Sequence, residues 1–381
     1  MIWLAYFIYF FLVLRFVVSL SNLLTLQWLR KLRDDLPMQG GKQPLVSVLI
    51  PARNEENNIC NLLEDLSSQN YENIEIHVYD DLSEDNTGNL VKNCRKKDCR
   101  IKLIEGGPLP EGWTGKNHAC HQLSRYANGD YLLFLDADVR IGKSAITNSL
   151  AHLAKHQLSL FSLFPVQKMH TPGEKITVPV MNWVLAGLLP LILTKISSRS
   201  SLSAANGQFM FFRAEDYHRY RFHAEHKNSI VEDIRIFRSV KKKGLKAHTI
   251  LSNGDISCRM YNSYKDSVNG FSRSVAEFFG GHLHLAALFA SVTTFGFIPV
   301  LVFLPSFYQF TFLTMLIIHR TLISWLSRQH VLQNLLLAPL QQVSFCLMVI
   351  MAYHHKLRHN LNWKGRNVYQ ASMQSSNTIK A

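Results

Sequence analysis

The segment YLLFLDADVR, residues 131–140, contains an apolar run that ends in two acidic residues separated by one alanine. If residues 131–136 form a strand, alternate side chains point the same way, so the carboxylates of Asp136 and Asp138 project toward the same space. At about 4 Å and an effective dielectric constant near 20, two such charges repel each other by roughly 4 kcal/mol. We therefore expect a partner beside this pair that offsets the repulsion.

Three further acidic motifs accompany this pair along the chain. PARNEE occupies residues 51–56, YDDLSEDNT occupies residues 79–87 and VEDIR occupies residues 231–235. A single acidic pair after a strand is usually a solvated turn or a helix cap. Four such motifs along one alternation of strands and helices are more than turns and helix caps would explain, so we interpret them as parts of one site.

Strands and helices that alternate in the sequence would bring these motifs together. The apolar runs LVSVLI, IEIHVYD and YLLFLDAD each precede a helical stretch, and these stretches begin near Glu56, Asn86 and Lys143. The alternation predicts an α/β domain with parallel strands over about 44–260. Ligands of such sheets bind at the carboxyl ends of the strands, where the acidic motifs lie.

Apolar segments near both ends of the chain indicate a membrane protein. Residues 2–29 are long enough to cross a hydrocarbon core of about 30 Å, and Arg15 is the one charged residue in this run. A cleaved signal peptide is the alternative, but its apolar region spans about 7–15 residues and precedes a small-residue cleavage site. This run is longer and basic residues follow it, so we predict a membrane anchor over 1–30.

We also predict C-terminal membrane helices over 283–353 and a basic tail over 354–381, from three apolar segments of spanning length: 283–304, 306–326 and 333–353. Residues 176–194 are apolar but contain two prolines, which leaves a buried core element and an interfacial helix as alternatives. Three spans would place the tail opposite the globular part, although its basic residues favour the same side. The sequence leaves this conflict open.

Composition supports the division into globular and membrane parts. Only 18% of the 381 residues are charged, against about 25% in a typical soluble domain, and the formal net charge is +14. The basic residues lie beside apolar segments, and most aromatic residues lie within those segments, so we predict contact with a membrane and none with nucleic acid. The six cysteines show no CxxC pair, which indicates reduced thiols and no disulfide framework.

The order of the motifs resembles that of family 2 glycosyltransferases with the GT-A fold, over about 44–280. In that family the first motif lies along the nucleotide, which implies donor binding by Pro51, Ala52, Arg53 and Glu55. YDDLSEDNT is similar to the family's DDGSxD stretch, although Leu82 replaces the glycine, and Asp81 matches the residue that contacts the nucleotide base. The resemblance implies a Rossmann-like α/β domain that binds a nucleotide-diphosphate sugar, with a UDP-sugar as the leading candidate.

The DAD stretch resembles the metal-binding DxD motif of the family. By that match Asp138 contacts a divalent metal directly, and Asp136 contacts the nucleotide or the metal side of the donor. Mg²⁺ or Mn²⁺ would fit, because both accept carboxylate, phosphate and water oxygens in octahedral geometry. The ion would offset the repulsion between the carboxylates and stabilise the departing diphosphate.

VEDIR resembles the ED motif of the family, whose aspartate is the usual base; here this is Asp233, with Glu232 as second candidate. The base would take a proton from an acceptor hydroxyl, and the sugar would be transferred in a single displacement with inversion. Neighbouring residues on a helix point about 100° apart, so we expect only one of the two to face the site directly. The alternative is an ordinary helix with acids at its start and lysines at its end.

PLPEGWTGKNHAC, residues 108–120, resembles a stretch of membrane-bound members of the family that glycosylate lipids such as carotenoid acids and hopanoids. Residues 203–217 and 362–369 are similar to further pieces of that subgroup. We expect Lys116, on a flexible GWTGK loop, to contact the donor phosphates, with an ordinary surface lysine as the alternative.

These features predict a multi-pass enzyme of the cell membrane, with a cytoplasmic catalytic domain, that moves one sugar to a lipid hydroxyl or carboxyl group. A processive polysaccharide synthase is the nearest alternative, but it would carry a QxxRW stretch, of which only Arg273 has a counterpart here. Transfer to polyprenyl phosphate stays open. A transporter or a nucleotide-binding membrane scaffold would need more intramembrane polar residues than Arg15, His319, Arg320, Gln341 and Gln342.

Overall fold

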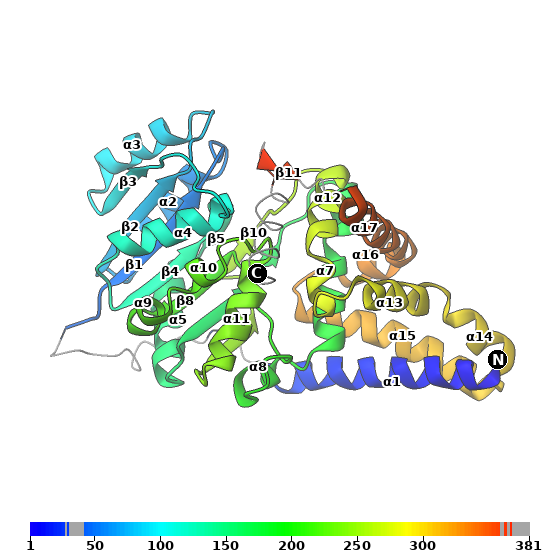
Figure 1. Ribbon diagram of the computed structural model, residues 1–381. Coiled ribbons are helices and arrows are strands. Elements are labelled where there is room, and N and C mark those ends of the chain that lie inside the picture. The colour runs from blue at the N-terminus through cyan, green and yellow to red at the C-terminus, as the bar shows by residue number, and fades with distance from the viewer. Residues whose placement is uncertain (27–28, 30–41, 359–361, 364–365, 368–381) are drawn as a thin grey trace, which may run out of the picture. The chain divides into compact units, whose positions relative to one another are not determined.

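The computed structural model describes residues 1–26, 29, 42–358, 362–363 and 366–367. They divide into two compact units (Figure 1). The sheet unit contains 42–166 and Thr194–Cys258, and the helical unit contains Met1–Leu26, Gln167–Leu193 and 259–358. The end of the predicted anchor, the basic residues that follow it and most of the predicted tail lie outside the described residues.

A seven-stranded sheet forms the centre of the sheet unit. Its strands lie in the order β3 (Ile101–Glu105), β2 (Ile74–Asp80), β1 (Val46–Ala52), β4 (Tyr131–Leu135), β8 (Phe209–Arg213), β6 (Leu160–Phe164) and β9 (Ala247–Leu251). β1 pairs in parallel with β2 and with β4, so the predicted parallel arrangement is confirmed for these strands. β8 is antiparallel to both of its neighbours, which the sequence did not predict.

Alternate side chains of the central strands enter two separate cores. Val48 and Ile50 of β1 pack into one core with Leu133 of β4, whereas Leu49 packs into the other with Phe134. The first core also receives side chains from α2 (Ile59–Ser67), α3 (Thr87–Lys97) and α5 (Ala145–Lys155), and the second from α4 (Gly115–Tyr126) and α11 (Glu232–Lys242). Strands that are buried on both faces consist of continuous apolar runs, which is why the sequence revealed them.

The predicted helices begin close to their expected starts, at Ile59, Thr87 and Ala145. Short elements complete the description: β5 (Val139–Ile141), β7 (Val166–Gln167), α8 (Ile192–Ile196), α9 (Ala214–Tyr220), α10 (Phe222–Glu225), β10 (Ile256–Cys258), β11 (Asn362–Trp363) and β12 (Arg366–Asn367). β10 pairs antiparallel with β5, directly after the DAD stretch. This pairing fixes one side of the site described below.

The helical unit contains α1 (Ile2–Leu24), α6 (Pro172–Thr177), α7 (Pro179–Leu188), α12 (Tyr264–Ser274), a 3-10 helix (Glu277–Phe279), α13 (Leu283–Phe295), α14 (Phe297–Phe303), α15 (Ser306–Leu326), α16 (Val331–Leu336) and α17 (Ala338–Arg358). The apolar segment 176–194 is divided among α6, α7 and α8. Proline starts a helix well but cannot continue one, so Pro179 opens α7 and Pro190 follows its end. Trp183 of α7 is buried within this unit.

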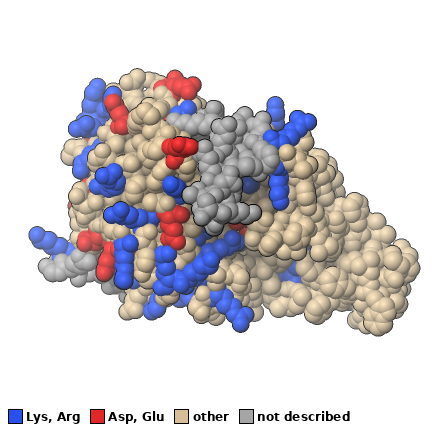
Figure 2. All heavy atoms as spheres, in the orientation of Figure 1, with Lys and Arg blue, Asp and Glu red and all other residues tan. Residues whose placement is uncertain are grey.

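The helical unit buries polar side chains and exposes apolar ones. The buried stripe of α1 consists of Ala5, Ile8, Leu12, Arg15, Ser19 and Asn22. On the same helix, Trp3 is 82% exposed and Phe7 is 60% exposed. In α17, Gln341 is buried and Ile350 is exposed, and Figure 2 shows few charged side chains on the visible face of this unit. Both helices thus expose apolar side chains and also bury some, which differs from the pattern of a helix that faces water.

Among the described helices, α1 alone is by itself long and apolar enough to cross a membrane, and α12 with α13 qualifies only as a pair bent by 105°. The structure does not show the predicted C-terminal spans. The first is interrupted between α13 and α14, α15 contains His319 and Arg320, and α17 contains Gln341. The N-terminal helix is the part of the membrane prediction that the structure supports.

Candidate active site

β4 places the predicted metal pair at the carboxyl end of the sheet. The strand ends at Leu135, and Asp136 and Asp138 follow before β5 begins at Val139. Burial, reinforced by the carboxylates of Asp136 and Glu55, raises the pKa of Asp138 to about 7. The charge of Asp136 contributes to this shift after burial, in the direction expected from the sequence.

Lys116 connects the metal pair to the candidate bases. Its Nζ lies 2.8 Å from Oδ1 of Asp136 and 3.2 Å from Oε1 of Glu232. The sequence suggested a flexible loop here, but Thr114 caps α4 by accepting the N–H of Asn117, and Lys116 lies in the first turn of that helix. Burial alone would lower the pKa of Lys116, yet the two carboxylates outweigh it and raise the pKa. The lysine stays charged and joins two acidic elements.

Both candidate bases lie in the first turn of α11. Oδ2 of Asp233 accepts the backbone N–H of Gly207 at 2.9 Å, and Oδ1 accepts the N–H of Ile234 at 2.8 Å. Burial, with the charge of Glu232, raises the pKa of Asp233 to about 7. Glu232 turns toward Lys116, so the two neighbouring acids have different partners, in keeping with their angular separation on a helix.

Gly207 lies where these groups meet. A Cβ atom at this position would lie 3.0 Å from Nζ of Lys116, 3.2 Å from Oε1 of Glu232 and 3.6 Å from Cβ of Asp233. A larger residue would push against charged groups from two helices. The turn before β8 thus lies close against the acidic site, and a Cβ here would displace the ends of Lys116 and Glu232 by a few tenths of an ångström.

The two loops expected to bind the nucleotide are joined to each other. Pro51 and Ala52 are the last residues of β1, and the oxygen of Ala52 accepts the N–H of Asp81 at 2.8 Å. Arg53 donates from Nη1 to the backbone oxygens of Asp81 at 2.6 Å and of Leu82 at 2.8 Å. Arg53 and Asp81 are 8% and 3% exposed. Arg53 therefore holds the turn that carries Asp81, a structural task that the sequence resemblance did not imply.

Leu82, which replaces the glycine of the family motif, has a φ of +54°. This left-handed conformation costs an L-residue about 1–2 kcal/mol, whereas glycine adopts it readily. The side chain is 46% exposed, so packing recovers little of that cost. The backbone at this position thus has a conformation that glycine favours, and in this protein a leucine adopts it at a cost in strain.

No role was predicted for three residues of the site: Gly207 and Gln208, which lie in the segment 203–217, and Cys258. The side-chain amide of Gln208 donates to Sγ of Cys258, and Cys258 pairs with Val139, which directly follows Asp138. A signal for the first two was present, because a polar NGQ turn directly precedes an apolar strand. Cys258 gave no signal, because its place depends on the pairing of β10 with β5.

The Asp136–Asp138 pair fits a divalent cation. Oδ1 of Asp138 is buried and has no hydrogen-bond partner among the described residues, which leaves an oxygen able to ligate. In the described part of the chain, no group of three or more His, Cys, Asp or Glu residues is placed to hold an ion alone. An ion held here would need further ligands, and phosphate and water oxygens are those that Mg²⁺ and Mn²⁺ accept.

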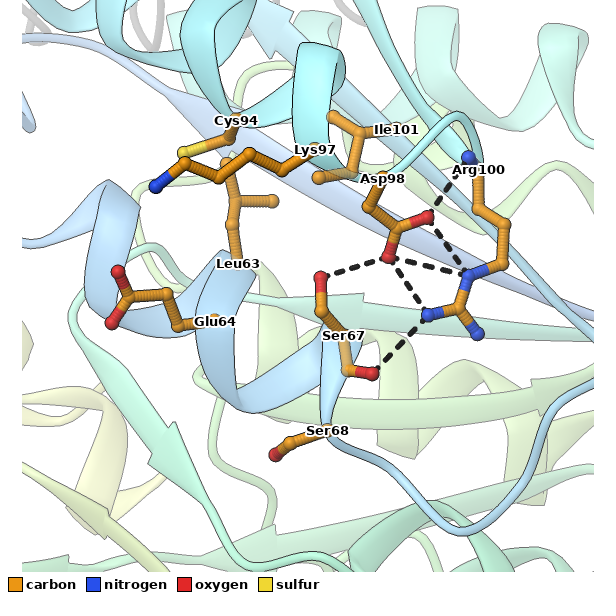
Figure 3. A pocket seen from close by; sticks show the side chains of 9 residues that line it. All are labelled: Leu63, Glu64, Ser67, Ser68, Cys94, Lys97, Asp98, Arg100 and Ile101. Carbon is orange, nitrogen blue, oxygen red and sulfur yellow. Dashed lines mark hydrogen bonds and ion pairs between the residues drawn. The ribbon is translucent and has the colours of Figure 1, made fainter.

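A cavity of about 520 Å³ lies elsewhere on the sheet unit, beside α2, α3 and the start of β3 (Figure 3). None of the candidate residues lines it. Two of its charged groups bind each other, since Arg100 pairs with Asp98 at 2.8 Å, and Asp98 also accepts the hydroxyl of Ser67. We assign no function to this cavity.

The sheet unit, with its parallel core and acidic motifs at the strand ends, has the GT-A fold. Residues 47–219 match the family described as Glycosyl transferase family 2. The chain carries a family 2 glycosyltransferase domain, and the resemblance inferred from the sequence motifs is confirmed.

Two relatives have names that include the molecule to which a sugar is added. The 4,4'-diaponeurosporenoate glycosyltransferase of Staphylococcus haemolyticus is 27% identical over 64% of this chain and 64% of its own length. The UDP-Glc:alpha-D-GlcNAc-diphosphoundecaprenol beta-1,3-glucosyltransferase WfgD of Escherichia coli is 28% identical over 46% of this chain and 67% of its own length. This chain thus spans less than two thirds of the first relative.

A solved structure has the same fold as this chain. The mannosyltransferase PcManGT from Pyrobaculum calidifontis, in complex with GDP-Man and Mn²⁺, is similar over 93% of this chain and 99% of that chain, with a TM-score of 0.55. The two sequences are 18% identical, so this likeness supports the fold alone.

Proposed function

We propose that this protein is a glycosyltransferase that moves one sugar from a nucleotide-diphosphate sugar to a membrane lipid. The observation that carries the proposal is the contact of Lys116 with Asp136 on one side and Glu232 on the other. Lys116 thus brings Asp136, which is expected on the donor side, and Glu232, a candidate base, into a single site. The family 2 match of residues 47–219 supports the same class of reaction.

On the donor side, Asp138 and Asp136 would hold Mg²⁺ or Mn²⁺, which when bound neutralises charge on the departing diphosphate. Lys116 adds a positive charge next to Asp136. We propose a UDP-sugar as donor, with Asp81 at the nucleotide base. Arg53 keeps Asp81 in place, and the remaining residues proposed to lie along the nucleotide are Pro51, Ala52 and Glu55.

On the acceptor side, Asp233 would take the proton of an acceptor hydroxyl. The acceptor oxygen bonds to the anomeric carbon while the bond from that carbon to the diphosphate oxygen breaks, and the electron pair leaves with the nucleoside diphosphate. Attack opposite the leaving group inverts the anomeric configuration. A pKa near 7 suits this task, because Asp233 can both accept and release a proton near neutral pH. An acceptor carboxylate would need no such proton transfer.

Two observations support a lipid acceptor. The helical unit exposes apolar side chains such as Trp3 and Phe7 while it buries Arg15 and Gln341, which suits an environment of lipid. The names of two relatives include diaponeurosporenoate and diphosphoundecaprenol. We propose that α1 anchors the protein and that enzyme and acceptor share one membrane, which raises their effective concentration. The multi-pass topology and the cytoplasmic side of the catalytic domain stay predictions.

The second relative favours a second candidate acceptor, a sugar carried on polyprenyl diphosphate. Both acceptors would yield one added sugar, whereas a processive synthase would yield products of increasing length. The identity and the length of the product therefore separate these alternatives.

The test is transfer of a labelled sugar by full-length protein in detergent with Mn²⁺. UDP-glucose, UDP-N-acetylglucosamine and GDP-mannose would each be offered with apolar carboxylic acids, diacylglycerol and undecaprenyl-linked sugars. We expect one donor to give a single labelled lipid, and Asp233→Asn to abolish it. Asp216→Asn is the matched control, because Asp216 pairs with Arg213 away from the site. Label in no lipid with any donor would contradict the proposal.

A further inference from the structure

We propose that Cys60 and Cys94 form an oxidisable pair, and that a disulfide between them restrains the two loops of the donor site and lowers donor turnover. This inference rests on the proposed function, because those loops carry the residues expected to bind the nucleotide. Sγ of Cys94 donates to Sγ of Cys60 at 3.8 Å. All six cysteines of the chain are free, so the structure shows this pair in its reduced form.

Helix packing brings the two thiols together. Cys60 is the second residue of α2, and Cys94 lies in the second half of α3. Both helices bury side chains in the same core of the sheet unit, as Leu63 and Val91 show, and both cysteines lie partly buried against that core. The S–S bond of a disulfide is about 2.05 Å long, so the two sulfurs would have to approach each other by about 1.8 Å.

The two helices begin directly after the loops of the donor site, and those loops are bonded to each other. The N–H of Glu55 donates to Oγ1 of Thr87, the first residue of α3, at 2.8 Å. The backbone oxygen of Glu55 accepts the N–H of Ile59, which directly precedes Cys60, at 3.0 Å. Movement of Cys60 toward Cys94 therefore acts on the turn that carries Glu55, one of the residues proposed to lie along the nucleotide.

Cys94 also lines the cavity of about 520 Å³ beside α2 and α3, so a small molecule that enters this cavity meets its sulfur (Figure 3). A low-molecular-weight disulfide such as oxidised glutathione would be the oxidant. The Cys94 thiolate attacks one sulfur of glutathione disulfide, and the glutathione thiolate that leaves takes up the proton lost by Cys94. The Cys60 thiolate then attacks the sulfur of Cys94, and the second glutathione leaves with the proton lost by Cys60. Two cysteine thiols are oxidised, and one glutathione disulfide is reduced to two thiols.

The resting state of the pair is the reduced one. Burial, reinforced by the hydrogen bond to Cys60, raises the pKa of the Cys94 thiol to about 11. Only a thiolate attacks a disulfide, so oxidation is slow at neutral pH and needs an excess of oxidant. The pair would therefore respond to oxidising stress and stay reduced otherwise.

The bland explanation is that the two cysteines fill space between the helices, as partly buried cysteines often do. The two explanations predict different outcomes with an oxidant. Packing alone predicts that oxidised glutathione leaves Cys60 and Cys94 as thiols, whereas an oxidisable pair becomes crosslinked.

The experiment exposes full-length protein in detergent to oxidised glutathione at about pH 8.5, which raises the thiolate fraction, and identifies crosslinked peptides by mass spectrometry. Cys99 is exposed and close in sequence to Cys94, so Cys99→Ser serves as the matched control. We expect a Cys60–Cys94 crosslink in the wild type and in Cys99→Ser, and none in Cys60→Ser. No crosslink, or a crosslink of Cys94 with Cys99 in its place, would overturn the inference.

A second readout, amide hydrogen exchange in residues 53–59 and 81–87, reports restraint of the loops and does not depend on turnover. We expect oxidation to slow this exchange by at least about threefold, and dithiothreitol to reverse the effect. The kcat/KM for the nucleotide sugar should fall by at least about threefold, because displacements near 1 Å can cost far more. Unchanged exchange, or unchanged turnover in an enzyme that is active when reduced, would overturn the inference. Slower exchange without turnover in either redox state would support the restraint and count against the proposed function instead.

Discussion

Nζ of Lys116 lies 3.2 Å from Oε1 of Glu232, so an ion pair joins the first turn of α4 to the first turn of α11. The same ammonium lies 2.8 Å from Asp136. The side chains of Glu232 and Asp136 are only 8% and 26% exposed, so solvent screens these contacts less than it screens surface pairs. Loss of Lys116 would leave both acids without this partner.

We expect Lys116→Met to lower donor turnover by about 10- to 150-fold, since removal of one charged hydrogen-bond donor costs roughly 1.5–3 kcal/mol. The effect should appear in kcat/KM for the nucleotide sugar. Lys227→Met is the matched control. Nζ of Lys227 lies near Gly112, 3.8 Å from where a Cβ would stand, and among the described residues Lys227 makes no ion pair with either acid. Turnover of Lys116→Met within twofold of the wild type would contradict this role.

A large part of the site could be predicted from the sequence because it depends on local patterns. Strands buried on both faces leave continuous apolar runs, and these runs placed Asp81, Asp136 and Asp138 at one edge of a sheet. The N-cap of α4 was also readable, because Thr114 stands directly before the Gly–Lys pair, but the two glycines suggested a loop instead.

The rest depends on contacts between distant parts of the chain. The antiparallel insertion of β8 between β4 and β6 brings Gly207 and Gln208 to the acids. The NGQ turn before this strand is visible in the sequence, but no local pattern signals where the strand inserts in the sheet. The C-terminal spans, which the structure does not show, stay a prediction for a related reason. In α15 and α17, buried polar residues such as His319 and Gln341 lie on the same helices as the apolar residues. The average apolar character of a segment does not distinguish the buried face of a helix from its exposed face.

The pH dependence of turnover should show an acidic limb near pH 7. Asp233 must be ionised to accept a proton, and its pKa is raised to about 7 by burial and by Glu232. Activity should therefore fall as the pH drops below that value. Glu232→Gln removes the neighbouring negative charge, so the pKa of Asp233 should fall and the limb should move to lower pH. A limb that stays in place or moves upward in Glu232→Gln would argue against Asp233 as the base.

Asp138→Asn should stabilise the protein in the absence of metal. The pKa of Asp138 is raised from 3.8 to about 7 in the folded state, so folding takes up a proton between these values. The free energy of unfolding should then decline as the pH rises from about 4 through 7, because ionisation of the buried carboxyl favours the unfolded chain. At pH 8 we expect Asp138→Asn to be more stable by about 1–3 kcal/mol, which corresponds to a few degrees in Tm.

At pH 5 the difference between Asp138→Asn and the wild type should shrink, since the carboxyl is then largely protonated in the folded wild type. Mn²⁺ should raise the Tm of the wild type and leave that of the variant unchanged. Thermal unfolding at both pH values, with and without Mn²⁺, measures all of these effects. A variant less stable than the wild type at pH 8 would show that the carboxylate is not strained by burial.

The effect of a substitution at Leu82 on stability should depend on how readily the new residue adopts a positive φ, and not on the size of its side chain. Leu82→Gly relieves about 1–2 kcal/mol of left-handed strain in the folded state. It also gives the unfolded chain more conformational freedom, which costs about 0.5–1 kcal/mol of stability. We therefore expect this variant to be as stable as the wild type or slightly more stable. Leu82→Val should destabilise by at least about 1 kcal/mol, because β-branched residues tolerate positive φ least. Chemical denaturation measures both. Leu82→Gly less stable than Leu82→Val would contradict the strained turn.

The measurement we would make first is nucleotide-sugar consumption by full-length protein with Mn²⁺ or with EDTA, for the wild type, Asp138→Asn and Asp233→Asn. Binding of the same donor would be measured in parallel by calorimetry. We expect the wild type to consume one donor with Mn²⁺ only, Asp138→Asn to lose both binding and consumption, and Asp233→Asn to bind donor without consuming it. A wild type that neither binds nor consumes any donor with Mn²⁺ and membrane lipid present would contradict the central claim.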